Sequence, residues 1–364
     1  MDRPVDQEKL RRLASSLLKW YSRHRRAFPW REEPTPYRIW VSEIMLQQTR
    51  IEAALPYFDR FMQALPTVSA LAQAEEGRLM KLWEGLGYYS RARNLQRAAK
   101  IVVADYGGQL PASYEELLSL PGIGEYTAGA IASMAYGLPV PAVDGNVLRV
   151  CARLLDDGGD ITRAPVKKRL RQAVCAMLPP DRPGDFNQAI MELGETVCLP
   201  NTVPLCGECP LREGCRGRLA GHPERLPVRA EKKARRVERR TVLLVQAGGR
   251  VLLHRREDKG LLAGLWELPS AEGWLEPEQA AAVAAAWGAA PRRVEPAGPG
   301  RHIFSHIEWQ MQGVRILTPP FDPPEGFLWA DERRLREETA LPSAFRTYSS
   351  RLPEWLADGA GEPG

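Results

Sequence analysis

Between Leu120 and Ala128 the sequence reads LPGIGEYTA, a glycine-rich turn between two predicted helices. Upstream, Ser113 and Glu116 have the spacing of a capping box, which marks the start of a short helix. Downstream, the residues of one helix face recur at Thr127, Ala130, Ile131 and Met134. The stretch is therefore predicted to form a helix–hairpin–helix.

The two glycines of this turn, Gly122 and Gly124, let the backbone approach a partner closely. The free N–H groups that open the second helix suit a phosphate group. The turn lacks the Gly-Lys-Ser/Thr ending of a nucleotide P-loop. A glycine-rich turn used only for packing is the alternative for an isolated match, and the neighbouring motifs favour the phosphate-binding interpretation.

The chain is longer than an ordinary single domain, since 364 residues favour two or three domains. From Gln7 to about Arg218, apolar residues recur at helical spacing with Pro and Gly between the runs, so we expect an all-helical body with no parallel sheet. Between Pro223 and Arg240 the apolar pattern gives way to basic residues, as is typical of an interdomain linker.

Beyond this linker the pattern changes to that of β-strands. Thr241–Gln246 and Arg250–His254 are β-rich runs joined through a glycine pair, which predicts a hairpin. The Ala-rich stretch Pro277–Trp287 is the expected helix of this smaller α+β domain. Pro- and Gly-rich pieces are expected to form loops or a frayed tail, at residues 295–300, 319–326 and 357–364.

The predicted fold is therefore mainly α, with a smaller α+β domain at the C-terminal end. The expected boundaries are a helical domain at residues 1–222, a basic linker at 223–239, an α+β domain at 240–355 and a tail at 356–364.

Composition excludes several classes of protein. The chain is 44% hydrophobic and 26% charged, with no apolar run near eighteen residues, which argues against collagen-like, disordered and transmembrane proteins. Charges throughout the first twenty residues leave no room for the apolar stretch of a signal peptide, so we expect a cytoplasmic protein, or a nucleoid-associated one in a bacterium, with no membrane partner. The net charge of +5 permits a polyanionic partner without establishing one.

Four of the six cysteines fall within eighteen positions, at Cys198, Cys206, Cys209 and Cys215. In a reducing compartment such a cluster indicates metal binding rather than disulfides. Four thiolates suit either tetrahedral zinc or a 4Fe-4S cluster, and spacing alone does not separate the two. Only one Cys-x2-Cys pair is present and it closes a helical domain, which differs from the paired arrangement of zinc ribbons.

Two carboxylates have contrasting surroundings. Glu43 lies among apolar residues in the middle of a predicted helix, where desolvation should raise its pKa and suit it to be a general acid. Asp144 precedes a helix that begins near Gly145, so the helix dipole and N–H donors should keep it ionised and able to stabilise a cation. Cleavage of a glycosidic bond needs such a pair. The alternatives are an ordinary surface Glu and a helix-capping Asp.

Together these motifs resemble the MutY-type adenine DNA glycosylases of the endonuclease III superfamily. The resemblance rests on FPWR at 28–31, EIMLQQT at 43–49, GLGYYSR at 85–91, LPGIGEYTA at 120–128, VDGNV at 143–147 and the four cysteines, and it continues past the linker. It implies two helical subdomains with a catalytic cleft, a 4Fe-4S cluster loop and a Nudix-like C-terminal domain that reads 8-oxoguanine. The implied reaction is hydrolysis of the N-glycosidic bond of adenine mispaired with 8-oxoguanine or guanine, in base excision repair.

The resemblance also implies roles for individual residues in catalysis. Glu43 would protonate the flipped adenine, and Asp144 would stabilise or trap the sugar cation. Asn146 would position the attacking group, and Tyr126 would line the site. The adenine pocket would include Trp30, Arg31 and Leu46.

Other residues would contact double-stranded DNA that contains the mispair. Gln48 and Tyr88 would wedge into the base stack beside the flipped nucleotide. The remaining implied DNA contacts are Arg91, Gly122, Gly124, Phe304, Ser305 and His306, of which the last three would sense 8-oxoguanine. Cys198, Cys206, Cys209 and Cys215 would hold the cluster. We expect the protein to act as a monomer.

Tyr126 distinguishes the main alternatives among enzymes. An endonuclease III-like glycosylase with lyase activity carries Lys at this position, because a Schiff base needs an amine. A non-catalytic iron–sulfur DNA-binding protein is a second alternative, and intact Glu43 and Asp144 argue against it.

Three features depart from the family pattern. The first cysteine interval has seven residues, where the family usually has six, and Leu199–Leu205 has no Lys or Arg for phosphate contacts. Gln188 stands where relatives often carry Glu. Gly264–Pro269 resembles the start of a Nudix box without the acidic residues that bind magnesium, so we expect a sensor domain rather than a pyrophosphohydrolase.

Overall fold

The computed structural model describes residues 7–230 and 234–359. The chain divides into two compact units, residues 1–73 with 94–232 and residues 74–93 with 233–364. Two parts of the predicted linker and tail, residues 231–233 and 360–364, lie outside the described residues.

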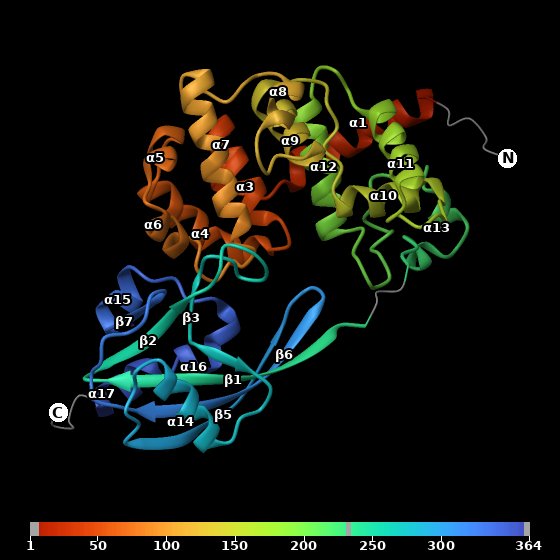
Figure 1. Cartoon of the computed structure of the whole chain (residues 1–364). Coiled ribbons are helices and arrows are strands. Elements are labelled where there is room, and N and C mark those ends of the chain that lie inside the picture. Colours follow the sequence, from red (N-terminus) through yellow and green to blue (C-terminus); the bar gives the residue numbers. More distant parts are fainter. Residues whose placement is uncertain (1–6, 231–233, 360–364) are drawn as a thin grey trace. The chain divides into compact units, whose positions relative to one another are not determined.

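Helices build the first unit, as the sequence predicts (Figure 1). They are α1 (Gln7–His24), α2 (Pro29–Glu32), α3 (Pro36–Leu46), α4 (Ile51–Ala64), α5 (Val68–Gln73), most of α7 (Ser90–Tyr106), α8 (Tyr114–Ser119), α9 (Glu125–Tyr136), α10 (Gly145–Leu155), α11 (Ala164–Met177), α12 (Pro183–Thr196) and α13 (Arg216–Leu219), followed by the 3-10 turn η1 (Pro223–Arg225). Over residues 7–230 the β pairing is limited to one isolated bridge, between Asp160 and Val228. Each helix in the described ranges is too short or too polar to cross a membrane.

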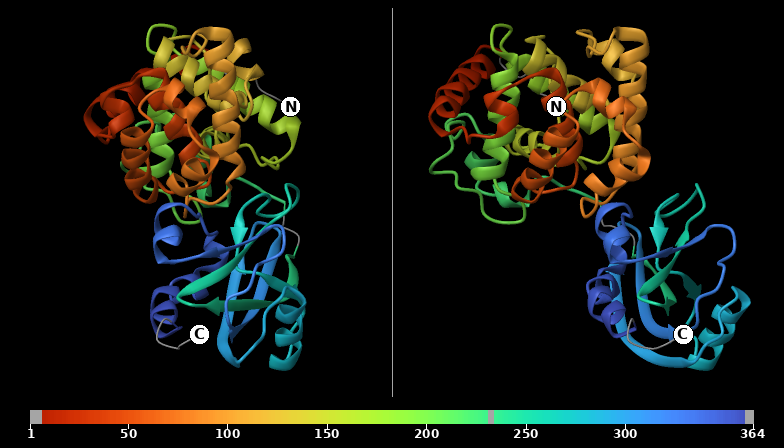
Figure 2. Two further views of the ribbon diagram at one scale, coloured as in Figure 1. Left: turned by 60° about the vertical axis from the view of Figure 1, so that its left-hand side comes forward. Right: turned by 90° about the vertical axis from the view of Figure 1, so that its left-hand side faces the viewer.

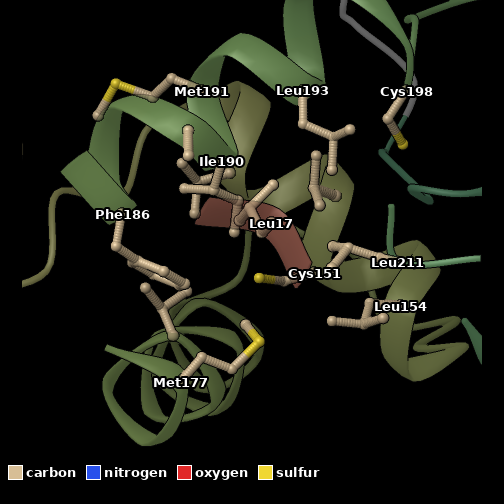
Figure 3. Packing of buried hydrophobic residues seen from close by; sticks show 14 of the residues in the cluster. Leu17, Cys151, Leu154, Met177, Phe186, Ile190, Met191, Leu193, Cys198 and Leu211 are labelled. Carbon is tan, nitrogen blue, oxygen red and sulfur yellow. The ribbon is translucent and has the colours of Figure 1, made fainter. Parts of the chain in front are cut away.

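The core of this unit lies where α1, α10, α11 and α12 meet (Figure 3). On α12, Phe186, Ile190 and Leu193 follow helical spacing and are fully buried. They share one apolar cluster with Leu17 of α1 and Cys151 of α10. This packing fixes the relative positions of α10 and α12, and both helices also carry polar groups of the candidate site.

The predicted helix–hairpin–helix is confirmed as α8, a short turn and α9. Ser113 caps α8 by accepting a hydrogen bond from the Glu116 N–H at 3.3 Å. Gly122 has a φ of +79°, and a Cβ there would lie 2.7 Å from the Cβ of Asn94. The turn therefore needs glycine at this position, both for its backbone conformation and for its close contact with α7.

Close packing of α9 is also visible at Gly129. A Cβ on Gly129 would lie 2.4 Å from the carbonyl oxygen of Pro141. The absence of a side chain lets α9 lie directly against the segment that leads into α10. This approach brings Tyr126, at the start of α9, towards Asp144, which immediately precedes α10.

The second unit contains one mixed sheet. Its strands, over the described residues, are β1 (Arg236–Ala247), β2 (Arg250–Arg255), β3 (Trp266–Glu267), β4 (Ser270–Glu272), β5 (Arg293–Ile303), β6 (Ile307–Leu317) and β7 (Phe327–Ala330). The order is β3-β2-β1-β6-β5, while β4 also pairs with β1 and β7 with β2. β1 and β6 run parallel, and the other pairs are antiparallel. The predicted hairpin is confirmed, with Ala247 opposite Arg250.

Both faces of this sheet are covered by helices (Figure 2, right). Leu243 and Val245 of β1 pack on the predicted helix, which is confirmed as α14 (Pro277–Ala286). Val242 and Leu244 point to the other face, towards η2 (Ser343–Phe345), α16 (Arg346–Ser349) and α17 (Leu352–Gly359). Because both faces are buried, β1 reads as a continuous apolar run rather than an alternating one.

The prediction of a loop at residues 295–300 is wrong, because these residues lie within β5. β5 is an edge strand that pairs only with β6 among the described strands, and the pairing is interrupted by an irregularity between Pro296 and Gly298. An edge strand and a bulge are the places where a sheet tolerates proline. The tail is also shorter than expected, because residues 357–359 complete α17.

The basic linker is shorter than the predicted 223–239. β1 begins at Arg236, where it pairs in parallel register with Ile307 of β6, so charged residues that resemble a linker form the exposed start of a strand. The division into units also differs from a boundary at residue 222. Residues 74–93, including α6 (Glu76–Leu82), belong with the C-terminal unit, because their side chains bond to its loops.

Candidate active site

Glu43 lies on α3 with its side chain enclosed by the helical unit, only 6% exposed. The Tyr126 hydroxyl donates a hydrogen bond to Glu43 Oε2 at 2.5 Å. Burial raises the pKa of Glu43 to about 7, although the Tyr126 hydrogen bond opposes this effect. The predicted direction is therefore confirmed, and Glu43 holds a proton over part of the neutral pH range.

Asp144 is the N-cap of α10, so its place at the start of a helix is confirmed. The Val147 N–H donates to Oδ1 at 2.8 Å, and Asn146 Nδ2 donates to Oδ2 at 2.9 Å. Burial nevertheless raises the pKa of Asp144 above its ordinary value, while these donors and Arg149 lower it. Its position at a helix start alone would lower the pKa of Asp144. The pKa is raised instead, because tertiary packing buries the carboxylate.

Asn146 is held from its other side by Arg149. Arg149 Nη2 donates to Asn146 Oδ1 at 2.9 Å and to the Gly194 carbonyl at 2.7 Å, while its Nε donates to the Cys198 carbonyl at 2.9 Å. A buried guanidinium with three acceptors is rigid. The asparagine side chain therefore has a fixed orientation, with its amide group directed at Asp144.

One cavity of about 770 Å³ in the helical unit brings the predicted catalytic and pocket residues together. Its walls include Trp30, Arg31, Glu43, Leu46, Gln48, Tyr126, Asp144 and Asn146. The volume falls within the range of small-molecule sites and exceeds the space a single base needs. Glu43 and Asp144 are far apart in the sequence, but their carboxyl groups line the same cavity.

An ion-pair network lies beside this cavity, and none of the sequence motifs described above predicts it. Glu192 on α12 is 1% exposed and pairs with Arg26 and with Arg31, the latter at 2.9 Å. Arg26 also pairs with Glu195. The available signal was the recurrence of Gln188, Glu192 and Glu195 on one face of an otherwise apolar helix.

Both predicted wedge residues adopt the left-handed backbone conformation. Gln48, in the turn after α3, has a φ of +58°, and Tyr88 has a φ of +47°. Such a conformation is uncommon for residues other than glycine and is often found at functional sites. Gln48 belongs to the helical unit and Tyr88 to the second unit, where its side chain is 48% exposed.

Arg91 lies inside the turn that carries Tyr88 rather than on its surface. Its side chain is 9% exposed, and Nη2 donates to the carbonyl groups of Leu86 and Gly87, both at 3.0 Å. Its guanidinium also lies 5.6 Å from the Tyr88 ring centroid. Arg91 thus fixes the shape of this turn, and a direct DNA contact stays a prediction.

The predicted sensor residues Phe304, Ser305 and His306 join β5 to β6 in the second unit. Phe304 packs edge-on against Trp309 with ring centroids 4.9 Å apart. Ser305 Oγ forms a hydrogen bond of 2.8 Å with the Tyr88 hydroxyl. These residues border a second cavity of about 470 Å³, also lined by residues 85–90, 260–263 and 342–344.

The four clustered cysteines line one small cavity in the helical unit. Arg153, which is 2% exposed, donates through Nη1 to Cys198 Sγ at 3.3 Å and to the Leu199 carbonyl at 2.9 Å. Within the described ranges, no three Cys, His, Asp or Glu side chains meet closely enough to bind a single metal ion.

Comparisons with known proteins show which families the two units resemble. Residues 41–175 match the HhH-GPD superfamily base excision DNA repair protein family, and residues 240–351 match the NUDIX domain family. A thermostable thymine-DNA glycosylase of known structure superposes with a TM-score of 0.53 at 27% identity, covering 58% of this chain and 98% of that protein. Endonuclease III in a trapped covalent DNA complex shares the fold, with a TM-score of 0.51 at 22% identity over 60% of this chain and 99% of that one.

The helical unit thus defines a base excision DNA repair protein of the helix–hairpin–helix superfamily. The adenine DNA glycosylase of Homo sapiens is 36% identical over 406 residues, covering 93% of this chain and 74% of the human protein. That of Schizosaccharomyces pombe is 30% identical over 95% of this chain and 90% of its own length. The chain belongs to the adenine DNA glycosylases, as the sequence motifs predict.

Proposed function

We propose that the protein hydrolyses the N-glycosidic bond of adenine mispaired with 8-oxoguanine or guanine in DNA, without cleaving the strand. The observation that carries the proposal is the pairing of a protonatable Glu43 with Asp144 on one cavity. Tyr126 supports hydrolysis without lyase action, because it offers a phenol where a Schiff base needs an amine.

Adenine inside a duplex is out of reach of any side chain, so the base must first be extruded. Extrusion costs a few kcal/mol, and less for a mispaired base, which favours mispairs over normal pairs. The adenine would enter the cavity lined by Trp30, Arg31 and Leu46. Gln48, in its left-handed turn at the cavity wall, would occupy the space left in the stack.

Glu43 would then donate its proton to the base as the glycosidic bond breaks. The Tyr126 hydroxyl donates to Oε2 and so holds the Glu43 carboxyl in place. A general acid contributes about 10²–10⁴ in rate, or roughly 3–5 kcal/mol. This contribution is too small for a whole enzymatic acceleration, so a second source of stabilisation is needed.

Asp144 would supply that second contribution by facing the cationic sugar. Its carboxylate is fixed by the Val147 N–H and by Asn146 Nδ2, and preorganised charge in a buried site stabilises a developing opposite charge strongly. Asn146 is oriented by Arg149 and would position the attacking water molecule beside the same carboxylate.

In the second unit, Tyr88 and the loop Phe304–His306 would read the base opposite adenine. The hydroxyl groups of Tyr88 and Ser305 lie 2.8 Å apart at the rim of the second cavity, so both can exchange their mutual hydrogen bond for bonds to a base edge. The backbone of Gly122 and Gly124, free of side chains, would contact a DNA phosphate.

We further infer that Cys198, Cys206, Cys209 and Cys215 hold a 4Fe-4S cluster. Tetrahedral zinc requires all four sulfur atoms within about 2.3 Å of one point. A cluster instead binds each thiolate through a different iron atom and so requires a wider spacing. Four cysteines around one cavity, without three ligands that meet at a point, fit the cluster better. Bound there, it would supply the folding energy that fixes the loop.

The metal content of the purified protein tests this assignment. Protein prepared without oxygen is expected to contain about four iron atoms and four sulfide ions per chain, with a visible absorbance band that dithionite or acid treatment alters. Stoichiometric zinc without iron would contradict the assignment and would leave the proposed glycosylase chemistry untouched.

The proposed reaction is tested with an end-labelled duplex that carries adenine opposite 8-oxoguanine. After incubation, half of the sample is treated with alkali, and both halves are separated on a denaturing gel. We expect cleavage at the adenine only in the alkali-treated half. Cleavage without alkali, at the rate of base release, would indicate lyase action and would favour an endonuclease III-like enzyme. Intact strands in both halves would favour a non-catalytic DNA-binding protein.

A further inference from the structure

Within the second unit, a lysine bonds the segment that carries Tyr88 to the C-terminal part of the chain. Lys81, at the end of α6, donates through Nζ to the Leu335 carbonyl at 2.7 Å and to the Thr339 carbonyl at 3.2 Å. These carbonyl groups lie at the C-terminal end of α15 (Glu332–Glu337) and just beyond it. Carbonyl groups at a helix end lack partners within the helix and favour a cation, so Lys81 satisfies them.

Glu84 extends this anchor to the wall of the second cavity. Its Oε2 accepts from Lys81 Nζ at 2.6 Å, and its Oε1 accepts from the Leu341 N–H at 2.7 Å. Leu341 leads directly into Pro342–Ala344, which line that cavity. Glu84 therefore joins the Lys81 anchor to one wall.

Arg93 makes a similar contact on the other side of the Tyr88 turn. Its Nη1 donates to the Ala263 carbonyl at 2.7 Å, and its Nε pairs with Glu76 at 2.7 Å. Ala263 lies in the loop at residues 260–265, which forms another wall of the cavity. The Tyr88 turn is thus held between two anchors, each of which also fixes a cavity wall.

Tyr88 stands between these anchors and faces the sensor loop. Its hydroxyl forms a hydrogen bond of 2.8 Å with Ser305 Oγ. Arg91 stabilises the turn through its hydrogen bond to the Leu86 carbonyl. 8-Oxoguanine differs from guanine by one oxygen atom and one N–H group. A site that distinguishes the two must hold a few polar atoms within a fraction of an ångström, which needs firm support from neighbouring residues.

We propose that Lys81 and Glu84 are positioning residues that set the preference for adenine opposite 8-oxoguanine over adenine opposite guanine. They act by fixing Tyr88 against Ser305 and by fixing the wall at Pro342–Ala344. The inference rests on the proposed function, since it assumes that the second cavity reads the base opposite adenine. Neither residue lies on the cavity that contains Glu43 and Asp144.

The test compares Lys81→Met and Glu84→Ala with the wild type in single-turnover excision. Each protein is assayed on one duplex with adenine opposite 8-oxoguanine and on another with adenine opposite guanine. We expect the ratio of the two rates to fall about five- to tenfold in both variants, because an anchor contact of this kind contributes roughly one factor of ten. Lys81→Arg retains a cationic donor and is expected to restore most of the ratio.

The matched control is Lys100→Met, which removes an exposed lysine of α7 outside the second unit and should retain the wild-type ratio. Melting temperatures are measured for every variant. If Lys81→Met is partly unfolded, the ratio of the two excision rates measured with Glu84→Ala decides whether the inference holds. An unchanged ratio, or equal losses on both duplexes, would overturn the inference. A wild-type protein that excises adenine from neither duplex would instead overturn the proposed function.

Discussion

Glu43→Gln is expected to slow adenine release by about 10²–10⁴-fold while leaving affinity for the mispair close to that of the wild type. Glutamine keeps the shape of the side chain and can still accept the hydrogen bond from Tyr126, but it carries no transferable proton. Single-turnover excision and a binding titration on the same duplex measure the two quantities. Excision within a few-fold of the wild-type rate would remove Glu43 from the mechanism.

The pH dependence of the wild-type enzyme follows from the same group. The pKa of Glu43 is raised to about 7, so the protonated fraction falls as the pH rises above that value. If protonated Glu43 is the acid, the excision rate should decrease on the alkaline side, approaching tenfold per pH unit. A rate that stays constant from pH 7 to pH 9 would contradict this assignment.

Stability measurements show whether Glu43→Gln loses activity because the proton donor is absent or because the protein is less well folded. A carboxyl whose folded-state pKa is raised stabilises the protein at low pH, and this contribution is lost as the pH rises through the folded pKa. Burying ionised Glu43 therefore destabilises the wild type above pH 7, by up to about 3 kcal/mol. Glu43→Gln should melt higher than the wild type at pH 8 and about equally near pH 4.5. Glu32→Gln, at an exposed position of α2, should show no such difference.

Asp144→Asn is expected to reduce excision by about 10²-fold or more, through loss of the negative charge that faces the sugar cation. Asparagine is also a good N-cap, so the hydrogen bond from the Val147 N–H and the fold of α10 should persist. The bond from Asn146 Nδ2 is lost, because the amide nitrogen cannot accept it. Single-turnover rates on adenine opposite guanine measure the effect, with melting temperature as the check on folding.

The matched control for this change is Asp331→Asn. Asp331 caps α15 by accepting from the Arg334 N–H at 2.7 Å, and it belongs to the second unit and is not among the residues that line the excision cavity. The two substitutions make the same chemical change at equivalent helix positions. Similar losses of activity in both variants would mean that capping, rather than charge in the cavity, explains the result.

The sequence predicts Glu43 and Asp144 as an acidic pair because the features that indicate each residue, an apolar helix and a helix start, are local. An apolar helix predicts burial of Glu43, and burial raises its pKa. For Asp144 the helix start was correctly expected, but its raised pKa depends on how closely other elements cover it. The ion pair between Arg26 and Glu192 joins residues 166 positions apart, so the polar face of α12 indicates an interaction there but does not identify Arg26 as the partner.

The strand β5 shows a similar limit in the second unit. Pro296, Pro299 and the glycines around them have the composition of a loop, but pairing with β6 along one edge is a property of the assembled sheet. Likewise, the motif around Tyr88 gives no indication that Lys81 and Glu84 bond to residues 254 to 258 positions later in the chain.

The position of residues 74–93 has a consequence for domain dissection. A fragment that ends at residue 232 would keep every group around the excision cavity. It would lose the carbonyl acceptors of Lys81 and Arg93 and the hydroxyl that meets Tyr88. Such a truncated enzyme would still cleave the glycosidic bond. Its preference for one lesion over another would change, because the groups that support Tyr88 would be absent.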